Sequence, residues 1–262
     1  MIELNKIYNQ DCIEFMKKMV EDNKTVDLIL TSPPYNTSRT TGTIENHEKR
    51  YDSYIENQTN DYYDNWTSSL FNLFDKILVH NGCVIYNISY GNENPSQMFT
   101  CINKVLSDTN FTIADVLGWK KHTALPNNVS SNKLTRIFEF VFIFCRKDEY
   151  STFHCNKKVI SKSITGQNIY ENIYNIVDAR NNDESTTLNK ATFSTEFACK
   201  LLSIYGKRDG VVYDPFMGTG TTAVACKKYG VKFLGTELSK DQCDHALRRL
   251  NSTHTPLFQH KF

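Results

Sequence analysis

The chain has 262 residues, of which 40% are hydrophobic and 23% charged, and its formal net charge is +1. These proportions are typical of globular proteins and exclude a collagen, a coiled-coil rod and a fully disordered chain. The sequence contains no apolar run of about 18 residues. Its first residues also lack the basic-then-apolar pattern of a signal peptide, so we expect no membrane span and a cytoplasmic protein.

Apolar runs and helical spacings alternate along the chain. Apolar runs predict strands at 27–31, 83–88, 137–145, 210–214 and 231–235, with a further element at 114–119. Spacings of three and four residues predict helices at 64–78, 98–106, 193–205, 221–229 and 239–250, the first ending at His80-Asn81-Gly82. This alternation predicts an α/β protein with a mostly parallel central sheet.

Two segments interrupt this alternation. Residues 37–64 form a long polar connection, and residues 146–188 lose periodicity and become basic and polar. Between Leu117 and Gly166 nine Lys and Arg stand against three Asp and Glu, a distribution that suits contact with phosphate. We therefore expect 1–145 and 189–262 to be two halves of one domain, and 146–188 to be a small recognition insert.

The eight cysteines form no C-x-x-C pair, and several stand inside apolar stretches. This pattern favours small buried side chains in a reducing compartment over a disulfide framework or a metal site. No other feature of the sequence demands a metal.

The segment Val211–Thr222, V-V-Y-D-P-F-M-G-T-G-T-T, combines a strand, a glycine-rich turn and the start of a helix. Asp214 is expected at the strand tip, where it could accept from a ligand ammonium. Glu237 is expected at the tip of the next strand, where a carboxylate can hold two ribose hydroxyls. The turn matches neither G-x-x-x-x-G-K-[ST] nor G-x-G-x-x-G, and it carries no basic residue. It therefore favours a ligand with an amine and a ribose, such as S-adenosylmethionine.

A second motif, Thr31-Ser32-Pro33-Pro34-Tyr35-Asn36, follows another predicted strand. The prolines fix φ and remove donors, so the hydroxyl of Ser32 and the carbonyls of Ser32 and Pro33 remain as acceptors. Tyr35 adds an aromatic face. The motif therefore suits a planar base with an exocyclic amine, whose hydrogens are accepted while its ring stacks on Tyr35. Such an amine is a poor nucleophile, and positioning against the electrophilic methyl of a sulfonium can supply much of the catalysis.

Together, D-P-F-x-G-x-G-T with a later Glu and T-S-P-P-Y-N resemble the amino-methylating DNA methyltransferases. The catalytic motif precedes the cofactor motif, which is the permuted order of that family's beta class. Further similar segments are Asn9–Cys12, the Tyr51, Tyr54 and Trp66 stretch, 119–127, 134–142 and 189–193. At 189–193 the chain departs from the family's H-P-A-x-F, because Asn189 and Lys190 replace His and Pro.

The resemblance implies a Rossmann-like methyltransferase fold, S-adenosylmethionine as cofactor, and roles for the matching residues. It places the flipped base at Ser32, Pro33, Pro34 and Tyr35. It implies cofactor contacts at Asp11, Thr192, Phe193, Asp214, Phe216, Gly218, Gly220, Thr221 and Glu237. Double-stranded DNA is the expected partner, with contacts at Asn36, Lys120, Lys133, Arg136, Lys157 and Lys158.

Ser32 favours cytosine N4 as the target, because the adenine enzymes of this family more often carry Asp or Asn there. Adenine N6 is the alternative, followed by an amine of RNA or of a small molecule, and by a DNA-binding or cofactor-sensing module without catalysis. The short insert fits a brief target site or help from a second subunit. The sequence leaves open whether the chain forms a homodimer and whether a cognate restriction endonuclease accompanies it.

Overall fold

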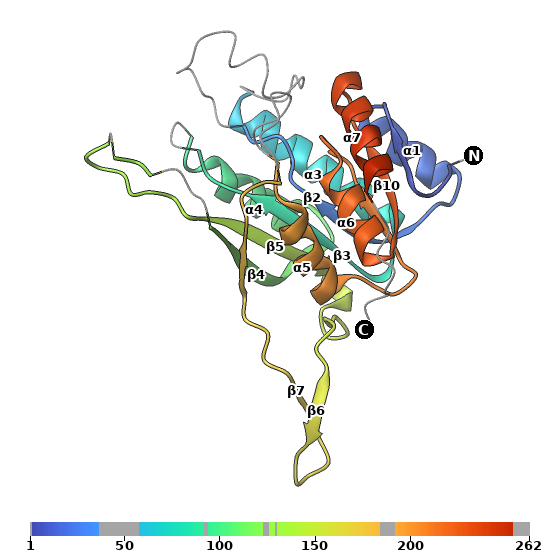
Figure 1. Ribbon diagram of the computed structural model, residues 1–262, viewed down its shortest axis with the longest axis vertical. Helices are drawn as coiled ribbons and strands as arrows, with labels where there is room; N and C mark the ends of the chain where they lie inside the picture. Colours follow the sequence, from blue (N-terminus) through green and yellow to red (C-terminus); the bar gives the residue numbers. More distant parts are fainter. Residues whose placement is uncertain are drawn as a thin grey trace.

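The computed structural model describes residues 2–36, 58–91, 94–122, 126–128, 130–183 and 192–253. Their centre is one eight-stranded sheet with the strand order β1-β10-β9-β2-β3-β5-β4-β8 (Figure 1). The strands are β1 (Lys6–Tyr8), β2 (Val26–Thr31), β3 (Leu78–Ile88), β4 (Phe111–Lys121), β5 (Phe138–Arg146), β8 (Ile176–Ala179), β9 (Val211–Asp214) and β10 (Lys232–Thr236). Within this sheet β5 alone runs against the others, which confirms the predicted mostly parallel sheet.

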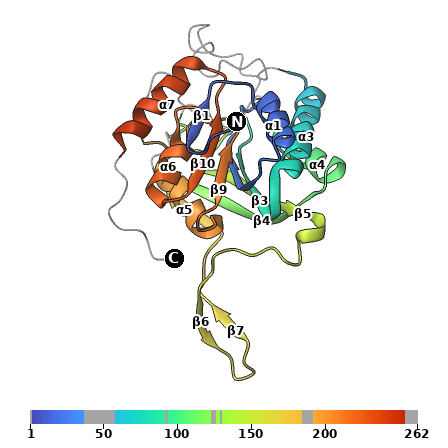
Figure 2. The ribbon, with the colours of Figure 1, turned by 90° about the vertical axis from the view of Figure 1, so that its right-hand side faces the viewer.

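Helices cover both faces of the sheet (Figure 2). One face carries α1 (Cys12–Glu21), α3 (Asn60–Ile77) and α4 (Gln97–Asp108), and the other carries α5 (Thr195–Tyr205), α6 (Thr221–Tyr229) and α7 (Lys240–Ser252). Side chains of one strand alternate between the two cores, so that Val84 and Tyr86 face the first set of helices and Cys83 and Ile85 the second. The three layers confirm the α/β fold class.

The junction of α3 and β3 differs from the sequence prediction. The helix ends at Ile77 and the strand begins at Leu78, so His80-Asn81-Gly82 lies inside the strand instead of forming a stop. Asn81 adopts a φ of +55°, and the pairing of β2 with β3 shifts register beside it. The guanidinium of Arg146 donates to the carbonyls of Asp75, Leu78 and Val79. These bonds satisfy the end of the helix, so no separate turn is needed.

Further short elements are absent from the sequence prediction. They are β1, α1, β6 (Val159–Lys162), β7 (Asn168–Tyr170), β8 and the 3-10 turn η1 (Lys147–Glu149). The strands and η1 in this group have three or four residues each, which is too few for a period to show, and distant partners decide the strand pairing: β1 lies along β10 and β8 along β4. The ten residues of α1 do carry a helical spacing, at Cys12, Phe15, Met16 and Met19, which the sequence prediction missed.

The segment 146–188 has two parts in its described residues. β6 and β7 form an antiparallel hairpin that projects away from the sheet and its helices (Figures 1 and 2). β8 returns to the central sheet, where Val177 and Ala179 are buried. The hairpin thus lies outside the core, whereas β8, the last strand of the segment, is part of the core.

A candidate active site at the carboxyl ends of the strands

Both sequence motifs lie at one edge of the sheet. β2 and β9 are neighbours, with Leu28 paired to Val212 and Ile29 to Tyr213, and β10 lies on the other side of β9. Ser32 follows β2, the glycine-rich turn follows β9, and Glu237 follows β10. The carboxyl edge of a parallel sheet is where α/β proteins bind their ligands.

The glycine-rich turn has a backbone that only glycine adopts easily. Gly218 and Gly220 have φ values of +54° and +86°, and Gly220 is the N-cap of α6. A Cβ on Gly220 would lie 2.7 Å from Cβ of Ala246 on α7. The second glycine therefore permits both the turn and the close approach of two helices.

Glu237 holds this turn in place. Its carboxylate accepts from the backbone N–H of Gly218 at 2.7 Å and of Ser239 at 2.8 Å. The side chain is half-buried at the tip of β10, as expected from the sequence. Each carboxylate oxygen has two lone pairs, so the side chain can accept from more than one donor at a time.

Asp214 is engaged inside the protein, whereas the sequence suggests an acceptor for a ligand ammonium. Its oxygens accept from Thr31 Oγ1 at 2.7 Å, Thr222 Oγ1 at 2.5 Å and the N–H of Phe216 at 3.0 Å. Burial raises the pKa of Asp214 to about 6, against the opposing effect of these hydrogen bonds. The carboxylate thus joins the end of β2 to the start of α6.

Aromatic rings border the turn. Phe216 lies with its ring centroid 5.6 Å from that of Trp66 on α3, and Trp66 lies 5.5 Å from Tyr63. Phe216 and Trp66 are both partly buried against the first core. Trp66 therefore packs in the first core and also stands beside Phe216, a predicted cofactor residue. Tyr51 and Tyr54 lie outside the described residues.

The other predicted cofactor residues have clear structural partners. Asp11 is the N-cap of α1 and accepts from the N–H of Ile13 and Glu14. Thr221 accepts from Arg249 Nη1 at 3.0 Å. Phe193 is buried against Phe197 on α5, next to a half-buried Thr192, and residues 189–191 lie outside the described ranges. Their contacts with a cofactor stay predictions.

The loop after β2 is held from α3 and from the neighbouring strands. Tyr63 donates to the carbonyl of Pro34 at 2.8 Å. The hydroxyl of Tyr35 lies 3.1 Å from Ser32 Oγ, 3.3 Å from the carbonyl of Asn87 and 3.4 Å from Oε2 of Glu139. Sequence reasoning assigned no role to Asn87 or Glu139, although Glu139 lies in the segment 134–142 that resembles the family.

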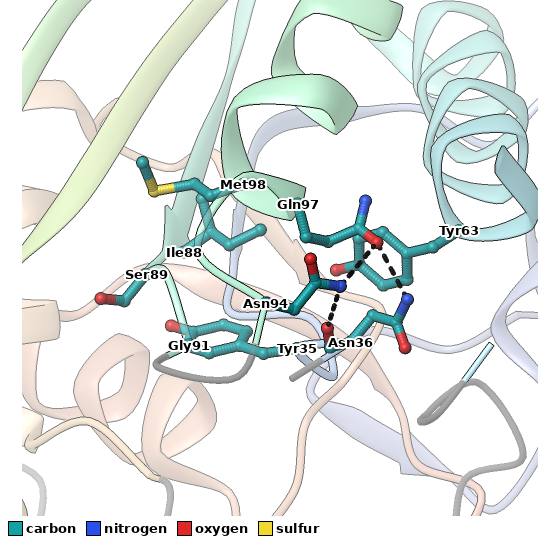
Figure 3. Close-up of a pocket in the computed structure, with 9 residues that line it drawn as sticks. All are labelled: Tyr35, Asn36, Tyr63, Ile88, Ser89, Gly91, Asn94, Gln97 and Met98. Carbon is teal, nitrogen blue, oxygen red and sulfur yellow. Dashed lines mark hydrogen bonds between the residues drawn. The ribbon is translucent and has the colours of Figure 1, made fainter. Parts of the chain in front are cut away.

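Asn36 is buried in a network of amides, not at the surface where a DNA contact is predicted. Its Nδ2 donates to Gln97 Oε1 at 2.9 Å and to the carbonyl of Gln58, and its Oδ1 accepts from the N–H of Gln58. Figure 3 shows Asn36 and Gln97 on one side of Tyr35, whose hydroxyl points the other way. Between Tyr35 and Met98 lies a cavity with room for about one water molecule, which is too small for a base.

The predicted phosphate contacts come from three places. Lys120 on β4 pairs with Asp178 at 3.1 Å. Arg136 lies 5.0 Å from the ring centre of Tyr90 and donates to its carbonyl, and Lys133 is exposed in the preceding segment. Lys157 and Lys158 stand at the base of the hairpin, one half-buried and the other exposed.

The residues at this edge fit S-adenosylmethionine. Glu237 offers a carboxylate to a ribose, the turn is built around backbone N–H groups at the start of α6, and Phe216 with Trp66 supplies aromatic surface. Among the described residues no group of three or more His, Cys, Asp and Glu could hold a metal ion. No helix in the described part of the chain is long and apolar enough to cross a membrane.

This arrangement of sheet, turn and S-P-P-Y loop defines an S-adenosylmethionine-dependent amino-methyltransferase of the beta class. Its catalytic motif precedes its cofactor motif along the chain. The DNA methylase family, with its N6- and N4-specific members, matches residues 26–248, and the chain belongs to this family.

Individual relatives agree with this assignment. The type II methyltransferase M.BglII of Bacillus subtilis is 24% identical over 95% of this chain and 69% of its own. The M1.HpyAVI–SAM complex has a TM-score of 0.66 at 24% identity, covering 94% of this chain and 98% of that one. The PvuII DNA methyltransferase, described as cytosine-N4-specific, has a TM-score of 0.67 at 17% identity, covering 93% and 85%. The last two likenesses concern the fold.

Proposed function

We propose that this enzyme methylates cytosine N4 in double-stranded DNA, at a specific site and on a flipped base. The observation that carries the proposal is the pairing of Ser32 Oγ with the hydroxyl of Tyr35, beside the cofactor turn at the same edge of the sheet. The alternative is adenine N6, which has the same exocyclic amine chemistry.

The amine is the reacting group, and its lone pair is delocalised into the ring of the base. Ser32 Oγ and the carbonyls of Ser32 and Pro33 accept its hydrogens, which favours a pyramidal nitrogen with its lone pair aimed at the methyl carbon. Tyr35 stacks on the base and fixes its plane. The bound sulfonium supplies an already electrophilic methyl group, so alignment supplies much of the rate.

Ser32 is the residue on which the choice of base rests. A serine at the first position of the S-P-P-Y motif favours cytosine N4, and Asp or Asn would favour adenine. The chemical support for a serine at this position is that a hydroxyl can accept from the amine and donate onward to Tyr35, whereas a carboxylate only accepts. An amine of RNA is a weaker candidate, because motif order and basic residues favour duplex DNA.

We propose that the segment 146–188 reads the target sequence through the β6–β7 hairpin. A two-stranded ribbon fits the major groove of DNA, and Lys157, Lys158 and Lys162 lie in or beside this hairpin.

A second copy of the chain and a cognate restriction endonuclease are further proposed partners. The eight cysteines, none of them in a disulfide, support a reducing cytoplasmic setting.

Incubation with labelled S-adenosylmethionine and mixed-sequence duplex DNA tests the function. The DNA is digested to nucleosides and analysed by mass spectrometry, with duplex RNA and free nucleosides as parallel substrates. N4-methylcytosine is the expected product. N6-methyladenine would keep the mechanism and reverse the assignment from Ser32, and cofactor binding without any labelled base would support a non-catalytic module.

A further inference from the structure

The proton released by the amine needs an acceptor, and the described residues around Ser32 contain one carboxylate in reach. When the exocyclic nitrogen gains a methyl group it must lose a proton. Ser32 Oγ accepts one of the amine hydrogens, so its own hydrogen must point elsewhere. The hydroxyl oxygen of Tyr35 lies 3.1 Å away in the position to accept it.

The hydroxyl of Tyr35 has one hydrogen to donate, and oxygens of Asn87 and Glu139 lie near it as acceptors. They are the carbonyl of Asn87 at 3.3 Å, Glu139 Oε2 at 3.4 Å and Asn87 Oδ1 at 3.5 Å. The amide of Asn87 is itself oriented, because its Nδ2 donates to the carbonyl of Phe140. A carbonyl or amide oxygen is too weak a base to take up a proton from a hydroxyl, whereas a carboxylate can accept one.

Glu139 is placed to act as that acceptor. Its other oxygen, Oε1, forms an ion pair with Lys121 from β4, whose Nζ lies 4.8 Å from the ring centre of Trp119. The side chains of Glu139 and Lys121 are 17% and 20% exposed, so the pair is largely enclosed and still touches solvent. Among the described residues, Lys121 from β4 and Tyr35 from the catalytic loop contact the carboxylate of Glu139.

We propose that Ser32, Tyr35 and Glu139 form a proton exit from the amine to solvent. The amine nitrogen forms its bond to the methyl carbon while the carbon–sulfur bond of the sulfonium breaks, its electron pair staying on sulfur, and the nitrogen releases a proton to Ser32 Oγ. The proton of Ser32 passes to the oxygen of Tyr35, and that of Tyr35 passes to Oε2 of Glu139. The net change is one carboxylate converted to a carboxylic acid, which then loses its proton to water. Hydrogen bonds of this length in an enzyme without substrate shorten in the reacting complex.

This inference rests on the proposed amino-methylation and assigns Glu139 a role beyond it. Glu139→Gln keeps the size of the side chain, but its amide has one acceptor oxygen and cannot take up the proton. We expect its single-turnover methylation rate to fall by about 100-fold, the usual range for general base catalysis, with cofactor affinity unchanged. Tyr35→Phe keeps the stacking ring and should give a loss of similar size that does not add to that of Glu139→Gln.

A merely structural role is distinguished by rescue and by pH. Formate added to Glu139→Ala should restore part of the rate, and the rate of Glu139→Gln should lose its dependence on pH in the acid range. Glu196→Gln, which removes a carboxylate paired with Lys200 on α5, is the matched control and should behave as wild type. A Glu139→Gln enzyme with wild-type rate would overturn the proposal, as would a loss that formate does not relieve.

A measurement that needs no turnover tests the proton exit independently of the proposed methylation. The ¹³Cζ resonance of labelled Tyr35 reports the charge of a carboxylate at its hydroxyl. We expect it to shift on acidification in the wild type and not in Glu139→Gln. The absence of this shift in the wild type would overturn the proton exit even in an active methyltransferase, whereas an inactive wild type that shows it would contradict only the proposed function.

Discussion

The two loops that meet at the edge of the sheet are held in different ways. The glycine turn after β9 is fixed by groups close to it in sequence, namely Asp214, Thr222 and Glu237, mostly through backbone N–H groups. The loop after β2 is fixed by side chains of α3, α4, β3 and β5, of which Tyr63 and Glu139 are examples. Changes in the first loop should therefore disturb folding and cofactor binding, and changes in the second should disturb the chemistry.

Tyr35→Ala gives the sharpest separation between the loops. It removes the ring expected to stack on the base, a contact worth about 1–3 kcal/mol, together with the alignment it provides. We expect turnover to fall by about 100-fold or more, with cofactor affinity by calorimetry nearly unchanged. Wild-type turnover in this variant would exclude the stacking role.

The glycine turn can be tested with two alanine substitutions at the two ends of α6. Gly220 and Gly230 have φ values of +86° and +82°, but only Gly220 would bring its Cβ against Ala246. Gly230→Ala should lower the free energy of unfolding by about 1 kcal/mol through backbone strain alone. Gly220→Ala should cost about 2–4 kcal/mol because overpacking adds to that strain. If urea denaturation gives both variants the same loss in free energy of unfolding, α7 moves away to relieve the contact with Gly220→Ala.

Sequence reasoning located both loops and could not find the side chains that hold the second. Strand and helix periods are local, so the tips at Asp214, Glu237 and Ser32 followed from them. The contact of Tyr35 with Glu139 depends on β5 lying antiparallel beside β3, which no local pattern encodes.

Asn36 and Asp214 have protein partners that the motifs did not predict. Their assignments to DNA and to the cofactor stay predictions. Gln58 and Gln97 hold Asn36, and Thr31 with Thr222 holds Asp214. The threonines stand inside the quoted motifs, so a hydroxyl flanking a buried carboxylate is a signal that could have been used. The partners of Asn36 are distant in sequence and carry no such signal.

Glu237→Ala tests whether changes near the glycine turn weaken cofactor binding. It removes a carboxylate expected to hold the ribose, and each charge-assisted hydrogen bond lost costs about 1.5–3 kcal/mol. We expect cofactor affinity by calorimetry to fall by about 10- to 100-fold. Glu14→Ala on α1, which removes an exposed carboxylate paired with Lys17, is the control and should bind normally. Unchanged affinity in Glu237→Ala would remove this residue from the site.

The smallest expected effect is the pH dependence that Asp214 gives to stability. Burial raises the pKa of this carboxyl from 3.8 to about 6, so the folded state binds the proton more tightly than the unfolded chain. Its contribution to the free energy of unfolding is therefore fully present below about pH 4 and is lost as the pH rises through 6, by at most about 1.4 kcal/mol per pH unit.

Asp214→Asn removes this titration while keeping the shape of the side chain. The difference in unfolding free energy between variant and wild type, measured by urea denaturation across this pH range, should shift in favour of the variant as the pH rises. A difference that is constant with pH would mean that the carboxyl is not desolvated in the folded protein. The hydrogen bonds from Thr31 and Thr222 would then keep the carboxyl of Asp214 ionised throughout this pH range. The link that Asp214 forms between the two loops would then carry a charge at every pH tested.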